Sequence, residues 1–321
     1  MHGTGSQDVL KLLARRLIWV VPILLVVSFL VFCLVDLAPG DPAVTLAGNS
    51  PDPAVIAEIR HTLHLDDPLP VRYATWLGNA ATGDLGTSFL TREQVWDMLT
   101  SRLPITMSVA LVAMIMSTAL GVAFGILGAL WPRSVVDRAV TVVGSLLIAV
   151  PPFWLALVLI LQMAVFRQWL PAIGYTAFTE SPWEWFRHLI MPGVALSAFA
   201  AAETALQLKG SLIDTLGRDY ILTTRAKGLT GKTILFKHAL RNAALPVVTV
   251  LGLRMTYLIG GAIIIEQVFT INGLGSLAIT AAQSSDVNVL LGIVMVGTVV
   301  AILMNALVDV TYGYLNPKLR T

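Results

Sequence analysis

The segment Arg218–Pro246, RDYILTTRAKGLTGKTILFKHALRNAALP, is the longest strongly cationic polar stretch of the chain. Apolar residues recur along it at roughly helical spacing, and Gly228 and Gly231 interrupt them. This pattern predicts two short helices that are joined by a glycine bend, each with one apolar side. The basic residues, which oppose the single acid Asp219, are Arg218, Arg225, Lys227, Lys232, Lys237 and Arg241.

Apolar runs flank this segment on both sides, so we expect it to lie at a membrane surface. Its charge permits two interpretations. The segment is either an elbow that docks to a protein in the cytosol, or a loop whose positive charges only set the topology of the neighbouring spans.

Composition sets the class of protein. The mean hydropathy is +0.79, and 12% of the 321 residues are charged, against about 25% in soluble chains. We therefore expect an all-α integral membrane protein. The net charge of +2 gives no reason to expect a nucleic-acid partner, and the single cysteine, Cys33, excludes an intrachain disulfide.

Six apolar runs are long enough to cross a hydrocarbon layer of about 30 Å at about 1.5 Å per residue. The first run is not followed by a small-x-small cleavage motif, which favours a retained span over a signal peptide. The predicted spans are residues 17–35, 105–131, 139–166, 189–208, 247–266 and 289–308.

These spans predict four parts of the chain. They are a cytosolic N-terminus (1–16), a first span (17–35), an extracytoplasmic segment (36–104) and a transmembrane domain (105–321) that contains the cationic loop 209–246. With the termini inside, the inner segments hold 14 basic residues and the outer ones hold six. That asymmetry predicts that both termini lie in the cytosol.

The extracytoplasmic segment is acidic and interrupted by turns. Turn and cap signals occur at Pro39–Pro42, His64–Pro68 and Gly83–Gly86. Between them, Pro53–Leu65 is helix-like, with its apolar residues on one side: Val55, Ile56, Ile59 and Leu63. These features predict a folded loop and indicate no particular substrate.

Two features predict the shape of the spans. Gly121-x-x-x-Gly125, followed by Gly128, allows a neighbouring helix to approach closely. Pro151-Pro152 removes two backbone donors inside the third span and predicts a kink there. That kink is either a wall of a passage or a packing feature.

Ionisable residues inside a bilayer are costly and usually face protein or water. The acids are Glu203, Glu266 and Asp309, and Arg254 is the one base. Either Arg254 or Glu266 faces a central passage and meets the charged ends of a zwitterionic peptide, or each pairs with a neighbouring helix. The second alternative is favoured.

Two stretches resemble chemical motifs incompletely. Gly228–Thr233 lacks the first glycine of a phosphate-binding loop, because residue 226 is alanine, and no apolar strand precedes it. His61 and His64 share one side of a helix-like stretch, but neither a cysteine pair nor an H-E-x-x-H motif accompanies them. We therefore predict no metal site, no catalytic residue and no ATP hydrolysis by this chain.

The cationic segment resembles the coupling loop of ABC-importer permeases, and most of all the branch that transports dipeptides, oligopeptides and nickel. The resemblance rests on RAKG at 225–228, HALRNA at 238–243 and Leu245-Pro246. Leu222-Thr223-Thr224 stands where the general pattern has Glu-Ala-Ala, which is usual in this branch. Val268–Gly275 resembles a re-entrant turn near the outer gate, with Asn272 in place of proline. The likeness extends from Pro39 to Pro317, and its matching C-terminal positions are Asn305, Asp309, Tyr312 and Pro317.

This resemblance implies roles for particular residues. The residues expected to couple the chain to an ATPase are Tyr220, Leu222, Thr223, Arg225, Ala226, Lys227, Gly228, His238, Arg241 and Asn242. The candidate passage or gate residues are Phe269, Gly273 and Gly275 of the re-entrant turn, Glu266, which matches a glutamate typical of this branch, and Arg254, which is a candidate only for its intramembrane charge.

The resemblance also implies a function. It is that of one permease subunit in a bacterial cytoplasmic membrane that imports dipeptides or oligopeptides by alternating access. The expected partners are a second homologous permease, two ATPases that hold ATP and Mg²⁺, an extracytoplasmic solute-binding protein and membrane lipid. Nickel, glutathione or another small ligand is the alternative cargo. A membrane enzyme and a passive channel are the alternatives from other classes.

Overall fold

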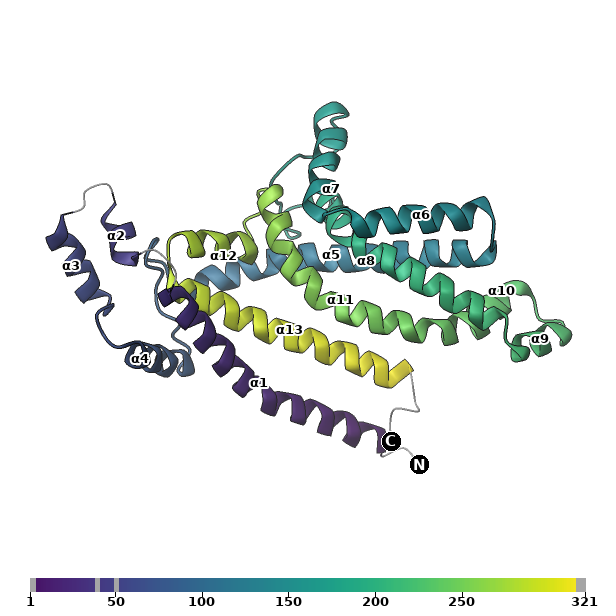
Figure 1. The fold of residues 1–321 in the computed structure, drawn as a ribbon, viewed down its shortest axis with the longest axis horizontal. Coiled ribbons are helices and arrows are strands. Elements are labelled where there is room, and N and C mark those ends of the chain that lie inside the picture. The colour runs from purple at the N-terminus through teal and green to yellow at the C-terminus, as the bar shows by residue number, and fades with distance from the viewer. Residues whose placement is uncertain (1–3, 38–40, 49–51, 316–321) are drawn as a thin grey trace. The chain divides into compact units, whose positions relative to one another are not determined.

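The computed structural model describes residues 4–37, 41–48 and 52–315, and its regular elements there are helices (Figure 1). The expectation of an all-helical chain is therefore confirmed, and an isolated bridge between Thr87 and Gln94 is the exception. The helices are α1 (Thr4–Leu37), α2 (Pro42–Ala47), α3 (Pro53–Thr62), α4 (Leu69–Ala81), α5 (Val95–Leu130), α6 (Val135–Ala149), α7 (Pro152–Leu159), η1 (Ile160–Phe166), α8 (Pro182–Leu216), α9 (Asp219–Ala226), α10 (Gly231–Thr233), η2 (Ile234–Ala239), α11 (Leu240–Val268), α12 (Leu274–Gln283) and α13 (Val287–Leu315).

Four helices in the described ranges are long and apolar enough to cross a membrane. They supply Val20–Leu37 of α1, α5, α8 and Val287–Ala306 of α13. A fifth span is formed if α6 and the α7–η1 helix count as one. The predicted span 247–266 lies within the 29-residue helix α11, and it is not tested because many side chains of α11 lie outside the described residues. The chain is therefore a multi-pass membrane protein, while the number of six spans stays a prediction.

Two predicted boundaries differ from the structure. The third span is broken: α6 ends at Ala149, α7 begins at Pro152, and the two helices meet at 106°. Two adjacent prolines supply no backbone donor, so the helix ends there rather than merely bending. The helix of the second span begins at Val95, ten residues before the predicted start. Val95 and Leu99 are buried, so protein packing extends this helix beyond its apolar run.

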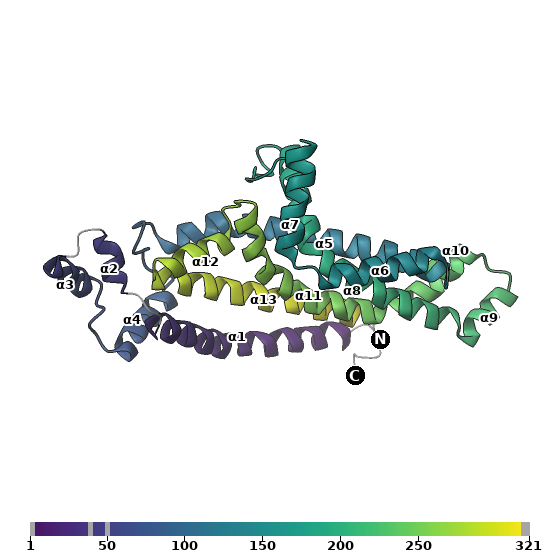
Figure 2. The same ribbon diagram turned by 45° about the horizontal axis from the view of Figure 1, so that its top comes forward.

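The chain forms two compact units. Unit 1 consists mainly of residues 107–271, and unit 2 combines residues 9–106 with 272–303. In unit 1, α8 is the central helix and contacts α6, α7 and α11 (Figures 1 and 2).

Small residues bring the helices of unit 1 into close contact. A Cβ atom at Gly121 would lie 2.6 Å from the Cβ of Thr204 on α8, and one at Gly125 would lie 2.9 Å from the Cβ of Leu208. Both distances are shorter than van der Waals contact, so only glycine fits. The close approach that the glycine spacing predicts is confirmed.

Unit 2 has an apolar cluster that joins α4, α5, α12 and α13. Polar contacts tie its loops to this cluster. Asp286, buried just before α13, accepts hydrogen bonds from the Ser88 hydroxyl (2.6 Å) and from the Phe89 N–H (2.9 Å). Asn288 donates to the carbonyl of Thr87 at 3.0 Å. The loop 87–90 is thus fixed to residues nearly 200 positions away.

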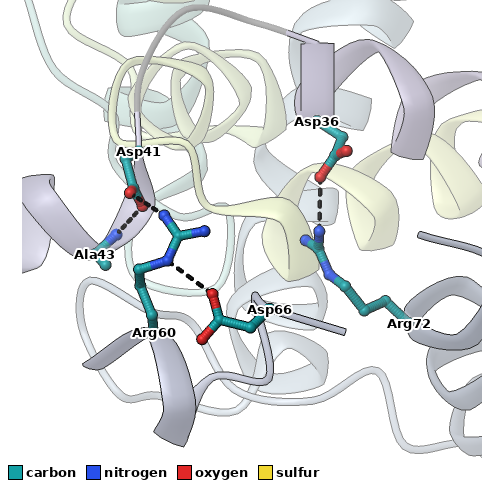
Figure 3. Close-up of polar contacts among 6 residues, drawn as sticks. All are labelled: Asp36, Asp41, Ala43, Arg60, Asp66 and Arg72. Atoms are coloured by element: carbon teal, nitrogen blue, oxygen red, sulfur yellow. Dashed lines mark hydrogen bonds and ion pairs between the residues drawn. The ribbon is translucent and has the colours of Figure 1, made fainter. Parts of the chain in front are cut away.

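The predicted helix in the loop is confirmed as α3, but none of its residues is buried. Its apolar side is only partly covered by the described chain, because Ile56 and Ile59 are half-buried and Val55 is 43% exposed. Arg60 instead joins α3 to the turns around it, because its guanidinium pairs with both Asp41 and Asp66 (Figure 3). The hydrogen bond to Asp66 and the charge of Asp41 raise the pKa of Arg60 above its ordinary value.

The predicted turns of this segment are present where the structure describes them. Gly83 and Gly86 have φ of +90° and +81°, which glycine adopts without strain. His64 also has a positive φ, of 53°. Asp41 caps α2 by accepting a hydrogen bond from the Ala43 N–H at 2.9 Å, whereas residues 39 and 40 lie outside the described residues.

Candidate functional site

The cationic segment folds into a bent pair of helices, which we call the basic elbow (residues 219–243). α9 ends at Ala226, and Gly228 turns the chain with a φ of +78°. A Cβ atom on Gly228 would have no neighbouring atom within 4 Å, so the turn depends on the backbone conformation and not on lack of space. Because that conformation strains residues with a Cβ, the glycine bend has a clear cause. The predicted bend and the first helix are therefore present.

The second predicted helix is not separate. α10 begins at Gly231, widens into the π-type helix η2 and continues without a break into α11. Pro246, where the predicted loop 209–246 ends, lies inside α11, so the helix begins before the predicted fifth span, and the boundary of the loop stays a prediction. Proline removes one hydrogen bond of the helix ladder, but the helix continues through it.

One face of the basic elbow is packed against the rest of unit 1. Ile221 of α9 is fully buried, and Ile234 and Leu235 of η2 lie in the same cluster. Leu208 and Leu212 of α8 belong to the same cluster. Apolar burial on this scale holds α9 and η2 to the end of α8, because each buried leucine or isoleucine side chain contributes about 2 kcal/mol.

The other face of the basic elbow is exposed and carries large apolar side chains. Phe236 is 60% exposed and Leu222 is 56% exposed. The cations around them are also exposed: Arg225, Lys227, Lys232, Lys237 and Arg241. Exposed aromatic and aliphatic groups within a charged rim are typical of a surface that another protein covers.

A side-chain link joins the two arms of the elbow. Asn242 on α11 donates through Nδ2 to the hydroxyl of Tyr220 on α9 at 2.9 Å, and to the carbonyl of His238 at 3.1 Å. The structure therefore brings together three of the predicted coupling residues. The other seven, Leu222, Thr223, Arg225, Ala226, Lys227, Gly228 and Arg241, are exposed on the elbow.

Phe236 was missed by sequence reasoning. Leu235 and Phe236 are adjacent apolar residues, and only the packing of η2 decides which one faces outward. The one sequence signal that could have favoured Phe236 as the outward-facing residue is Lys237, because this charged neighbour is itself expected on the exposed side.

Arg254 of α11 pairs with Glu203 of α8. Its Nη2 lies 2.8 Å from Oε1 of Glu203, and Nε contacts the other carboxylate oxygen, so the pair is bidentate. The guanidinium also lies over the ring of Phe199, 4.8 Å from its centroid, and near Tyr257. For Arg254, the expectation of a partner on a neighbouring helix is confirmed.

The candidate gate residues are buried. Glu266 and Phe269 are inaccessible in unit 1, where the Gly174 N–H donates to the carbonyl of Phe269 at 2.9 Å. Gly273 and Gly275 belong to unit 2, at the start of α12, and are buried there. The side chain of Asp309 and the whole of Pro317 lie outside the described residues.

No group of three potential metal ligands occurs within the described ranges.

Residues 9–110 match the family described as binding-protein-dependent transport system membrane component, N-terminal, and residues 121–321 match the binding-protein-dependent transport system inner membrane component. The chain belongs to this permease family. It is thus the permease component of an ABC importer, and such importers include ATPase and substrate-binding partners.

The permease is similar over nearly its whole length to curated relatives. A probable peptide ABC transporter permease of Sinorhizobium fredii is 36% identical over 95% of this chain and 98% of the relative. A putative peptide transport system permease of Brucella abortus is 36% identical over 96% and 98%. A glutathione transport system permease of Escherichia coli O6:H1 is 37% identical over 97% and 99%.

Solved structures support the fold of the permease. The inward-facing MetNI methionine ABC transporter aligns with a TM-score of 0.56 at 17% identity, over 68% of this chain and 96% of that chain. At this identity the likeness concerns the arrangement of helices alone.

Proposed function

We propose that this permease imports short peptides across a bacterial cytoplasmic membrane, together with a second permease, two ATPases and a solute-binding protein. The names of the curated relatives support peptides as the cargo. The excess of basic residues in the predicted inner segments supports termini in the cytosol.

Glutathione is the second candidate cargo, because a relative with that name is 37% identical over nearly the whole chain. Glutathione is itself a tripeptide, so the two proposals differ in specificity rather than in chemical class. Nickel, the other alternative of this branch, has no supporting observation in the described part of the chain.

The basic elbow is the proposed ATPase-docking surface. The exposed Phe236 carries this proposal, because an aromatic side chain in water gains free energy when a partner covers it. The buried face of the elbow would then transmit movement of the ATPases to α8 and α11. Alternating access would follow as closure of the ATPases shifts the permease between two conformations.

Substitution of Phe236 tests the docking surface. In a reconstituted importer, Phe236→Asp should lower ATPase affinity about 30-fold, which corresponds to about 2 kcal/mol for a central aromatic contact. Co-purification of the ATPases and ATP-dependent peptide uptake are the measurements. Val55→Asp on α3 is the matched control, because Val55 is also an exposed apolar residue on a helix. Wild-type uptake and ATPase retention in Phe236→Asp would refute docking at this surface.

Competition distinguishes the cargoes. Uptake of labelled dialanine by the wild-type importer should be blocked by excess unlabelled dipeptide. Uptake of labelled glutathione, with no uptake of labelled dialanine, would instead favour the second candidate.

A further inference from the structure

A groove of about 480 Å³ runs along unit 1 between α5 and α6, with α8 as its floor (Figures 1 and 2). The two helices pack on different sides of α8. Gly121 of α5 approaches Thr204 on one side, and Gly144 of α6 approaches Leu206 on another. Small side chains form the floor between these contacts and larger, exposed ones form the rims: Ala198, Ala201 and Ala205 on α8, Phe124 on α5 and Val143 on α6.

The walls of the groove are apolar. Ser197 of α8 is the one polar side chain among the described residues that line it, and its hydroxyl already donates to the carbonyl of Val194 at 3.2 Å. Apolar walls of this kind offer water no hydrogen-bond partners, so water leaves them favourably. Both α5 and α8 are long and apolar enough to cross a membrane, so hydrocarbon is the medium available to fill the groove.

The groove is long and narrow. It extends along α6 from Val135 to Leu147, which is about 18 Å at about 1.5 Å per residue. A volume of about 480 Å³ over that length gives a cross-section of about 27 Å². A helix about 10 Å across takes about 80 Å². A helix of another protein is therefore too wide to lie within the groove, whereas a single extended hydrocarbon chain fits.

One end of the groove lies at the polar surface of the membrane. Val135 and Val136 line it there, just after the turn that joins α5 to α6. Ala129, near the end of α5, belongs to the apolar cluster that holds the basic elbow, so this turn lies on the same side of the membrane as the elbow. Trp131 is exposed at the turn, which is typical of the level of the lipid headgroups.

Two arginines flank this end of the groove. Arg133 and Arg138 are exposed, and neither guanidinium forms an ion pair with a described side chain. The nearby acid, Asp137, is already paired, because Nζ of Lys209 lies 2.6 Å from its Oδ1 and the Arg133 N–H donates to its Oδ2 at 2.8 Å. The two arginines are therefore available to an anion, and basic side chains at a membrane surface attract anionic headgroups.

We propose that this groove binds one acyl chain of an anionic phospholipid, whose phosphate lies between Arg133 and Arg138. The chain lies over the alanine floor of α8, where burial of its CH₂ groups holds it in place. The other chain of the lipid stays in the bilayer. The inference does not depend on the cargo of the importer, because it uses only the walls of the groove and the two arginines.

Native mass spectrometry tests this proposal on the full-length permease assembled with its partner subunits in detergent. Phosphatidylglycerol and phosphatidylcholine with identical acyl chains are added in turn. Phosphatidylglycerol should be retained saturably and about 30-fold more tightly than phosphatidylcholine, which carries no net charge. Equal retention of the two lipids, or retention that does not saturate, would overturn the proposal.

Substitution of the arginines localises the headgroup. Arg133→Gln and Arg138→Gln should each lower the affinity for phosphatidylglycerol about fivefold and leave the affinity for phosphatidylcholine unchanged. Both side chains are exposed, so the fold does not depend on them. Arg218→Gln removes an exposed cation just before α9, outside the groove walls, and this matched control should retain phosphatidylglycerol like the wild type. Wild-type retention in both groove variants would contradict the inference.

A bulkier floor tests the site of the acyl chain separately. Ala198→Leu should fill the groove and weaken retention of both lipids about tenfold, because the displaced CH₂ groups lose their contacts. Ala119→Leu on α5 is the matched control, since Ala119 is exposed and lies outside the groove walls. Equal retention by Ala198→Leu and the wild type would show that lipid does not occupy this groove.

Assembly of the importer distinguishes a lipid from a protein occupant. Loss of lipid retention in Ala198→Leu, with intact assembly, is the expected result. If Ala198→Leu instead leaves lipid retention unchanged and lowers co-purification of the second permease, that subunit covers the groove and the lipid proposal is wrong. Peptide uptake plays no part in these measurements, so their failure would leave the proposed function untouched.

Discussion

In unit 1, α5 and α8 approach so closely at Gly121 and Gly125 that no side chain fits between them. In unit 2, by contrast, directional polar contacts attach the loops: Asp286 holds the loop 87–90, and Arg60 joins α3 to two turns. The first arrangement depends on shape and the second on charge. We therefore expect the two units to respond to different kinds of substitution.

The Arg254–Glu203 pair is the strongest test of this contrast, because it is a polar contact inside the unit that relies on close packing. Arg254→Leu should destabilise the permease by about 3 kcal/mol, the lower end for a buried pair, because the Glu203 carboxylate that loses its partner is 31% exposed. The midpoint of thermal unfolding in detergent is the measurement. The double variant Arg254→Leu/Glu203→Leu should recover most of the loss.

Uptake by that double variant then separates the two roles considered for Arg254. A folded and active double variant means that the pair is structural. A folded but inactive one would show that Arg254 acts in the passage. An unfolded double variant would contradict the prediction that the lost pair, rather than the lost side chains, causes the instability.

Gly121→Leu should lower the stability of unit 1 by about 3 kcal/mol, because overpacking forces α5 away from Thr204. The same thermal measurement applies. Gly210→Ala on α8 is the matched control, since no atom lies within 4 Å of its added Cβ. That variant should equal or slightly exceed the wild type in stability. Equal midpoints for Gly121→Leu and the wild type would show that the helices separate without cost.

Asp286→Ala should destabilise unit 2 by about 2 kcal/mol, because the Phe89 N–H and the Ser88 hydroxyl lose a charged acceptor. Faster hydrogen exchange at Phe89 is the measurement, and Asp286→Asn should be intermediate because it keeps an acceptor. Arg60→Ala, at a side chain that is 39% exposed, should cost less than about 1 kcal/mol. Slow exchange at Phe89 in Asp286→Ala would contradict the proposed role of this contact.

Local sequence signals predicted the features that depend on a single segment. The glycine spacing identified the contact surface of α5, and Gly228 identified the bend of the elbow. The caps and turns around α3 were predicted because aspartate, proline and glycine act over a few residues. Most helices were therefore predicted, although their ends were not.

Contacts between distant segments were not predictable. Arg254 and Glu203 are 51 positions apart, and Asp286 and Ser88 are 198 apart, so no periodicity connects them. The sharp break at Pro151-Pro152 was underestimated because proline indicates a lost hydrogen bond and not an angle. At the candidate site, sequence reasoning located the elbow but could not decide that Phe236, rather than Leu235, faces outward.

The uninterrupted helix from Gly231 to Val268 has a mechanical consequence. Over a length of about 57 Å at 1.5 Å per residue, it behaves as a shaft whose two ends turn through the same angle. Torque applied near Phe236 would reach the far end, reduced by what the widened turn of η2 and the missing hydrogen bond at Pro246 absorb. Sliding the shaft lengthwise would instead shear every contact with α8, so rotation is the easier way to carry a signal along it.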